Sequence, residues 1–207
     1  AAARRFAALA AAVEASPHGE ARDLELANID THLGHYLVAL GKHDEAWSHF
    51  SRAAMLLRAR LSPRHHLLGN ALFNLATHRL PSSSLDEAAS RFEEAIAIFE
   101  EGGDACRASL GSCLHNLAHL REEQGRDADA RALWERALAM EQAHWGLHHP
   151  NLRPTLVRLG QVCERTGSPL VAAALYTRAH DIAQEDLGED HPITRALAAW
   201  KRSHTEG

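Results

Sequence analysis

Residues 113–150 read CLHNLAHLREEQGRDADARALWERALAMEQAHWGLHHP, and this stretch decides the fold. Apolar residues recur every three to four positions on both sides of Gly125, a spacing typical of amphipathic helices. Glycine adopts the left-handed backbone that ends a helix at little cost. The stretch therefore predicts two helices joined by a glycine-centred turn.

The landmarks of this stretch return every 42 residues along the chain, in four copies. The first helix of each copy carries a leucine and a small residue: Leu33-Gly34, Leu75-Ala76, Leu117-Ala118 and Leu159-Gly160. The turn residues are Gly41, Ser83, Gly125 and Gly167. The second helix carries alanine, an aromatic residue and alanine: Ala46, Phe50, Ala53; Ala88, Phe92, Ala95; Ala130, Trp134, Ala137; Ala172, Tyr176, Ala179. Small residues let helices cross closely, and such a period predicts a solenoid of stacked helix pairs.

Two short motifs accompany the repeat. Residues 187–192 read LGEDHP and match an LG-x-x-HP closing motif, residues 145–150 match it less well, and residues 74–76 and 116–118 both read NLA. With these motifs the chain resembles the tetratricopeptide repeat family, in the 42-residue form of kinesin light chains and many bacterial proteins. The resemblance implies an all-α fold, a right-handed α-solenoid of antiparallel helix pairs (a TPR superhelix), and a function in binding proteins or peptides.

Helix breakers predict the division of the chain. We expect residues 1–19 to be the second helix of a truncated upstream repeat, ended by Ser16-Pro17-His18-Gly19. Four units should follow over 20–191, at about 20–62, 63–103, 104–149 and 150–191, the first with helices near 20–40 and 43–60. Residues 192–207 are expected to be a capping helix and tail. The chain is thus interpreted as part of a larger protein.

Composition limits the function and the location. The net charge of −5 over 207 residues argues against a nucleic-acid-binding surface, which would show a basic excess. No apolar run reaches the roughly 18 residues of a membrane span. The three cysteines form no C-x-x-C motif, so we expect no disulfide framework and a cytoplasmic location.

The resemblance places the binding site on the first helices of the units, which line a concave groove in this family. Asn74 and Asn116 match positions that clamp a peptide backbone, because an amide both donates and accepts hydrogen bonds. Arg158 and Arg165 could take a carboxylate. The predicted groove residues are Asn28, His32, His35, Asn70, Asn74, Thr77, Ser112, His115, Asn116, His119, Arg158, Gln161 and Arg165.

Metal binding and catalysis are weaker alternatives. His115 and His119 have the i, i+4 spacing of a chelating pair, but Asn116 stands where an HExxH motif would have its glutamate. The phosphate-loop, dinucleotide-binding and nucleophile-elbow motifs are missing. We therefore predict no metal, no cofactor and no enzymatic activity.

The sequence hypothesis is a protein-interaction scaffold that binds an extended peptide or a partner helix, as a regulatory or sensor domain of a larger bacterial protein. Self-assembly through exposed terminal repeats is the alternative left open, and a histidine-based metal sensor is a third.

Overall fold

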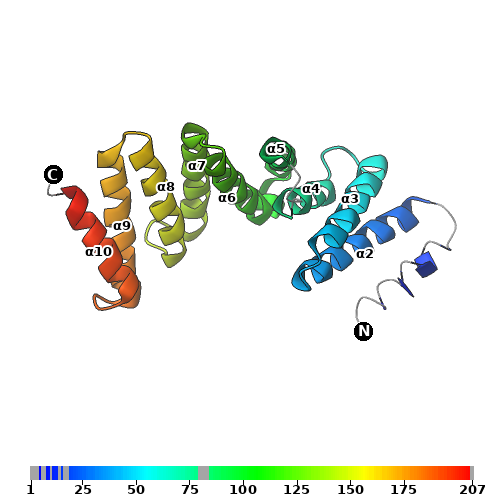
Figure 1. Ribbon diagram of the computed structural model, residues 1–207, viewed down its shortest axis with the longest axis horizontal. Coiled ribbons are helices and arrows are strands. Elements are labelled where there is room, and N and C mark those ends of the chain that lie inside the picture. The colour runs from blue at the N-terminus through cyan, green and yellow to red at the C-terminus, as the bar shows by residue number, and fades with distance from the viewer. Residues whose placement is uncertain are drawn as a thin grey trace. The chain divides into compact units, whose positions relative to one another are not determined.

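The computed structural model describes residues 19–78 and 84–205, together with residues 5, 8, 9, 11–13 and 15. The chain forms two compact units, unit 1 (Ala1–Cys113) and unit 2 (Leu114–Gly207). Within the described ranges every regular element is a helix, so the all-α prediction is confirmed (Figure 1).

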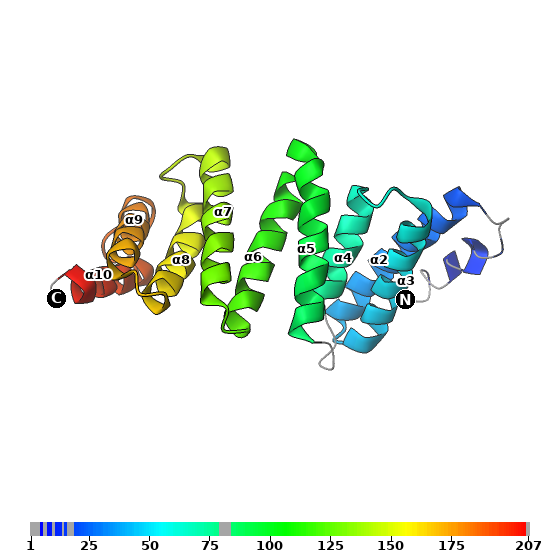
Figure 2. The ribbon, with the colours of Figure 1, turned by 90° about the horizontal axis from the view of Figure 1, so that it is seen from above.

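Unit 1 contains two helix pairs. α2 (Glu20–Ala39) packs against α3 (His43–Arg60), and α4 (His66–Thr77) packs against α5 (Leu85–Glu101). α3 also contacts α4, so the second pair stacks on the first (Figure 2). A 3-10 helix, η1 (Gly103–Cys106), leads into α6 (Arg107–Glu123), whose first residues belong to this unit.

Unit 2 continues with the rest of α6 and then α7 (Asp127–Trp145), η2 (Pro150–Leu152), α8 (Arg153–Arg165), α9 (Pro169–Leu187) and α10 (Pro192–Thr205). α7 packs against α8, α8 against α9 and α9 against α10, and Figure 1 shows the last three helices side by side. Their shared core includes Trp134, Leu156 and Tyr176, all at most 2% exposed.

The turns form as the sequence predicts. Gly41, Gly125 and Gly167 have φ angles of 74°, 70° and 72°, in the left-handed region that favours glycine. Ser83, the fourth predicted turn residue, lies outside the described residues. The neighbouring Ser84 accepts a hydrogen bond from the backbone N–H of Glu87 at 3.1 Å, which caps α5.

The small residues lie where helices cross closely. A Cβ added to Gly34 would lie 2.5 Å from a ring carbon of Phe50, and one added to Gly160 would lie 2.8 Å from the ring of Tyr176. Both aromatic rings are buried, and Ala53 beside Phe50 is fully buried. The landmarks of the repeat are therefore the contacts of the helix pairs.

One core position of unit 1 holds a carboxylate. Asp30 is fully buried at the position that leucines occupy one, two and three steps of 42 residues later. Arg52 donates to it from Nε at 2.5 Å and from Nη2 at 2.6 Å, and Nδ1 of His49 lies 2.8 Å from its Oδ1. These bonds compensate the burial of the charge.

Other details refine the sequence interpretation. Pro150 begins a 3-10 helix, and α8 starts three residues later at Arg153. Much of the predicted first helix lies outside the described residues, Phe6 included; Val13 is buried against Leu26 and Ile29. The division into four units and a cap stays a prediction. In the part of the chain that the structure describes, every helix falls short of the length and apolar character that a membrane span requires.

Candidate functional site

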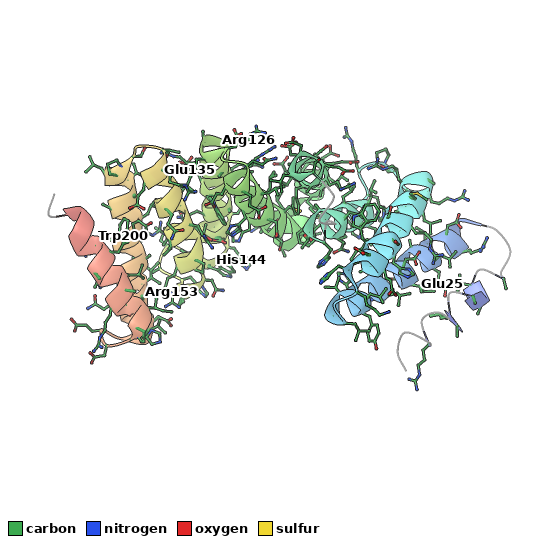
Figure 3. The ribbon with its side chains drawn as sticks, in the orientation of Figure 1. Glu25, Arg126, Glu135, His144, Arg153 and Trp200 are labelled. Atoms are coloured by element: carbon green, nitrogen blue, oxygen red, sulfur yellow. The ribbon has the colours of Figure 1, made fainter. Side chains whose placement is uncertain are left out.

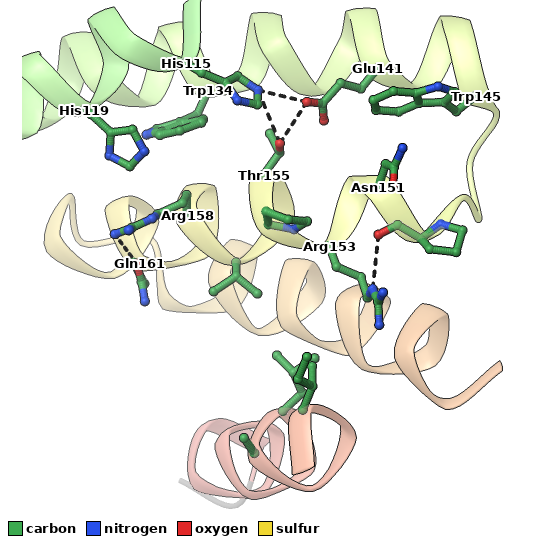
Figure 4. A pocket seen from close by; sticks show the side chains of 16 residues that line it. His115, His119, Trp134, Glu141, Trp145, Asn151, Arg153, Thr155, Arg158 and Gln161 are labelled. Carbon is green, nitrogen blue, oxygen red and sulfur yellow. Dashed lines mark hydrogen bonds and ion pairs between the residues drawn. The ribbon is translucent and has the colours of Figure 1, made fainter. Parts of the chain in front are cut away.

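A pocket of about 1030 Å³ opens in unit 2 (Figure 4). Its walls come from α6, α7, α8 and α10, together with the first residues of η2. The lining residues are His115, His119, Trp134, Glu141, Trp145, Pro150, Asn151, Arg153, Pro154, Thr155, Val157, Arg158, Gln161, Ile193, Ala196 and Leu197. The pocket therefore combines aromatic and aliphatic surface with a few polar groups.

The aromatic wall is built on Trp134, which is 1% exposed. The ring of His119 packs edge-on against it with centroids 4.9 Å apart, and the ring of His115 lies 5.1 Å away. The indole N–H donates to Glu122 Oε1 at 2.8 Å, which fixes the tryptophan. These contacts hold both imidazoles at the pocket wall.

A polar cluster of three residues lies farther along the pocket. Glu141 Oε1 lies 2.8 Å from Nε2 of His115 and accepts a hydrogen bond from the Thr155 hydroxyl at 3.0 Å. The hydroxyl also lies 3.5 Å from the same Nε2 atom. A catalytic triad needs the nucleophilic hydroxyl and the orienting carboxylate on opposite nitrogens of the histidine ring. This arrangement places carboxylate and hydroxyl on one nitrogen, so it does not have triad geometry.

The end of the pocket near His119 is cationic. Arg158 is exposed, forms no ion pair with any residue in the described ranges, and donates to Gln161 at 3.5 Å. Burial lowers the pKa of His119, and the positive charge of Arg158 lowers it further. Figure 4 shows Arg158 and Trp145 at opposite ends of the pocket, with Trp134 and His119 at the end of Arg158.

Arg153 strengthens the floor of the pocket rather than offering a charge. Its Nε donates to the carbonyl of Pro150 at 3.1 Å, and its Nη2 lies 3.0 Å from the Asp186 carboxylate. The side chain thus bonds to η2 and α9, and Figure 3 labels Arg153 among the helices of unit 2.

The structure brings four of the predicted groove residues together in this pocket: His115, His119, Arg158 and Gln161. Asn116 is half-buried and does not line it. Arg165 lies elsewhere, with Nη2 2.6 Å from Glu122 and 2.9 Å from Asp127, so its guanidinium joins α8 to α6 and α7. That Arg165 takes a carboxylate of a ligand stays a prediction, and two carboxylates of this chain already contact its guanidinium.

The remaining predicted residues belong to unit 1. Asn28, His32 and Ser112 are exposed, and Asn70 and Thr77 are half-buried. Ser112 donates to the carbonyl of Ala108, within its own helix. Asn74 is only 5% exposed, which leaves its amide little surface for a peptide. The clamp by Asn74 and Asn116 stays a prediction.

His35 packs against the first aromatic landmark. Its ring lies 5.1 Å from that of Phe50, on which the ring of His78 also stacks at 5.4 Å. Partial burial lowers the pKa of both imidazoles, and each is lowered further by a neighbouring histidine, His32 beside His35 and His35 beside His78.

Sequence reasoning missed Glu141, Thr155 and Trp145 as pocket residues. The repeat register contained a signal for the first two: a step of 42 residues connects Glu141 to Phe99 and Thr155 to Cys113, both buried. Both polar residues thus stand at positions that are apolar and buried in the preceding copy. For the metal alternative, residues 19–78 and 84–205 contain no group of three His, Cys, Asp or Glu side chains able to hold an ion.

Comparison with known families identifies the fold. The tetratricopeptide repeat model matches residues 25–101 and 109–185, which together make up more than half of the chain. The chain belongs to the tetratricopeptide repeat family. The TPR matches include every landmark of the 42-residue register up to Tyr176.

Solved structures support the kinesin-light-chain-like form of the TPR fold. The nearly identical TPR-like repeats of a Podosopora anserina protein described as a kinesin light chain superpose with a TM-score of 0.72 at 19% identity, over 86% of this chain and 84% of that one. BtubC (BKLC) from P. vanneervenii gives 0.70 at 20% identity, over 99% and 84%. The resemblance seen in the sequence is confirmed.

A third structure is aspartyl phosphate phosphatase F from Bacillus subtilis, with a TM-score of 0.68 at 16% identity over 91% of this chain. The chain spans 49% of that protein, about half its length. At these identities the structures establish the fold alone. A search of curated proteins gave no match.

Proposed function

We propose that this TPR chain binds a segment of a partner protein in the pocket of unit 2. The observation that carries the proposal is the open pocket itself, which has about 1030 Å³ of space and a mixed lining. Ligand sites in proteins are typically concave, about 300–1,000 Å³ in volume, and mostly apolar with a few polar groups that fix orientation. The TPR fold is consistent with a protein-interaction scaffold, so the ligand we propose is a peptide segment of a partner protein.

The two ends of the pocket give the ligand a direction. Trp145 offers apolar surface at one end (Figure 4), and Pro150 and Ile193 add apolar surface to the lining. Arg158 lies at the other end and forms no ion pair among the described residues. This supports the prediction that Arg158 binds a carboxylate of the ligand. A segment that lies along α8 would therefore place an acidic residue at Arg158 and an apolar side chain near Trp145.

Binding, rather than catalysis, is the activity that this pocket supports. Its polar cluster lacks triad geometry because Glu141 and Thr155 meet His115 at the same nitrogen. We further propose that the chain works in the cytoplasm, where its three cysteines, all buried and unpaired, would stay reduced. The pocket would then serve a regulatory or sensor role within a larger protein.

The test uses random peptides of about 12 residues displayed on phage and selected against the full chain. Selected peptides are then measured against Ala196→Trp, which places an indole in the pocket from an exposed position on α10. The matched control is Ala199→Trp, exposed on the same helix but outside the pocket lining. We expect Ala196→Trp to abolish binding and Ala199→Trp to preserve it. Equal binding by both variants would place the site elsewhere.

A further inference from the structure

Two residues of the pocket stand at core positions of the repeat. Steps of 42 residues connect Glu141 to Leu57, Phe99 and Ala183, and connect Thr155 to Ile29, Ala71 and Cys113. All six of these equivalents are apolar, and none is more than 5% exposed. Two consecutive copies thus meet at the pocket, one with a carboxylate and the next with a hydroxyl where the other copies hold core side chains.

The carboxylate of Glu141 is only partly compensated by its surroundings. Its Oε1 has two partners, His115 and Thr155, and its side chain is 14% exposed. Its Oε2 is buried and has no hydrogen-bond partner. Burying an unpaired acceptor on a charged group costs free energy that an apolar side chain would not cost. The fold alone therefore gives no reason for a glutamate here.

The cluster fixes the carboxylate at the wall of an open pocket. Thr155 is 1% exposed and cannot move away, and the ring of His115 is held against Trp134. Glu141 and Trp145 are four residues apart on α7, so they share one face of the helix. An indole beside a carboxylate suits a cation, which the ring face and the negative charge attract together.

We infer that Glu141, held by Thr155 and His115, is the subsite for a lysine or arginine side chain of the bound segment, an inference that rests on the proposed function of this pocket. An ammonium or guanidinium group in the pocket compensates the charge of the Glu141 carboxylate, whose side chain is 14% exposed at the pocket wall. Arg158 lies three residues beyond Thr155 on α8, about 5 Å along the helix. The ligand therefore carries a basic residue close to an acidic one, and their order sets its direction in the pocket.

The test compares peptide selections on three full-length proteins: the wild type, Glu141→Gln and Glu141→Leu. Selection on the wild type should enrich peptides that carry both a basic and an acidic residue. Changing the basic residue of such a peptide to glutamine should weaken its binding about 10- to 100-fold, as expected for a lost charge-assisted contact. Peptides selected on Glu141→Gln should still be enriched in the acidic residue but no longer in the basic one.

Glu141→Leu separates a binding role from a structural one, because it restores the residue of an equivalent position, Leu57. We expect its urea midpoint of unfolding to equal or exceed that of the wild type, with the basic preference lost. A lower midpoint with the basic preference unchanged would overturn the inference, because the cluster would then be structural. If the peptides selected on the wild-type protein carried no basic residue, the inference would also be overturned. The pocket could still be the binding site in that case. Failure of the wild type to retain any peptide would refute the proposed function itself.

Discussion

Replacing Gly34 by alanine tests the close crossing of α2 and α3. The added Cβ would lie 2.5, 2.8 and 2.8 Å from three ring carbons of Phe50, closer than real Cβ contacts allow. Phe50 is fully buried and is in contact with the rings of His35 and His78, so its ring has little room to move. Overpacking of this kind costs about 1–3 kcal/mol.

Alanine also favours the helix over glycine, by about 1 kcal/mol, and this gain must be separated from the clash. Gly111→Ala provides the control, because Gly111 also lies within a helix of unit 1 and a Cβ there meets nothing within 4 Å. We expect Gly111→Ala to raise the free energy of unfolding by about 1 kcal/mol. The free energy of unfolding of Gly34→Ala should be about 1–3 kcal/mol lower than that of Gly111→Ala, since both variants share the gain in helix propensity.

The assay is urea unfolding followed by circular dichroism, with the slope of the transition compared among the three proteins. Repeat proteins can unfold in steps, so a shared slope is needed before the free energies are compared. If Gly34→Ala stabilised the protein as much as Gly111→Ala, the ring of Phe50 would not rest against α2. The account of the small residues as crossing points would then be wrong.

Burial lowers the pKa values of His35 and His78 below about 6.5, so the stability contributed by their neutral rings is present above that pH and lost as the pH falls below it. The urea midpoint of unfolding should therefore be lower at about pH 5.5 than at about pH 7.5, and this difference should be smaller in His78→Phe. An equal difference in the wild type and the variant would contradict this. Burial raises the pKa of the Cys113 thiol to about 12, so a thiol reagent at about pH 8 should modify it only after unfolding, as mass spectrometry would locate; modification in the folded protein would count against the buried position. Replacing the ion pair as a whole, with Asp30→Leu and Arg52→Met together, should leave the free energy of unfolding unchanged or raise it by up to about 4 kcal/mol; a loss in urea unfolding would mean that the ion pair is stabilising.

The fold was predictable because its constraints are local and repeated. Each landmark makes a contact within one helix pair or with the next. Gly34, for example, is small because the ring of Phe50, sixteen positions later, packs against it. The helix α3 begins and ends where the sequence predicts, at residues 43 and 60. The sequence does not distinguish the 3-10 helix that begins at Pro150 from an α-helix, since a proline suits the first turn of either.

The pocket was less predictable because its lining combines four helices. Helical spacing assigns His119 and Arg158 to one side of their helices, and both line the pocket. The same spacing does not show whether a charged side chain already has an ion-pair partner. Arg165 is an example, because Asp127 of another helix pairs with it. Glu141 was missed for a third reason: it sits on a second helix of the repeat, outside the groove positions implied by the family.

The most direct measurement of the central claim uses the side-chain indole signals of the four tryptophans in a ¹H–¹⁵N NMR spectrum, assigned by single Trp→Phe substitutions. A phage-selected peptide is titrated into the full chain. If the peptide binds in the pocket of unit 2, the signals of Trp134 and Trp145, which line it, should shift on binding. The signal of Trp47, in unit 1, should stay unchanged. A shift of Trp47 with Trp134 and Trp145 unaffected would contradict the account and move the binding site to unit 1.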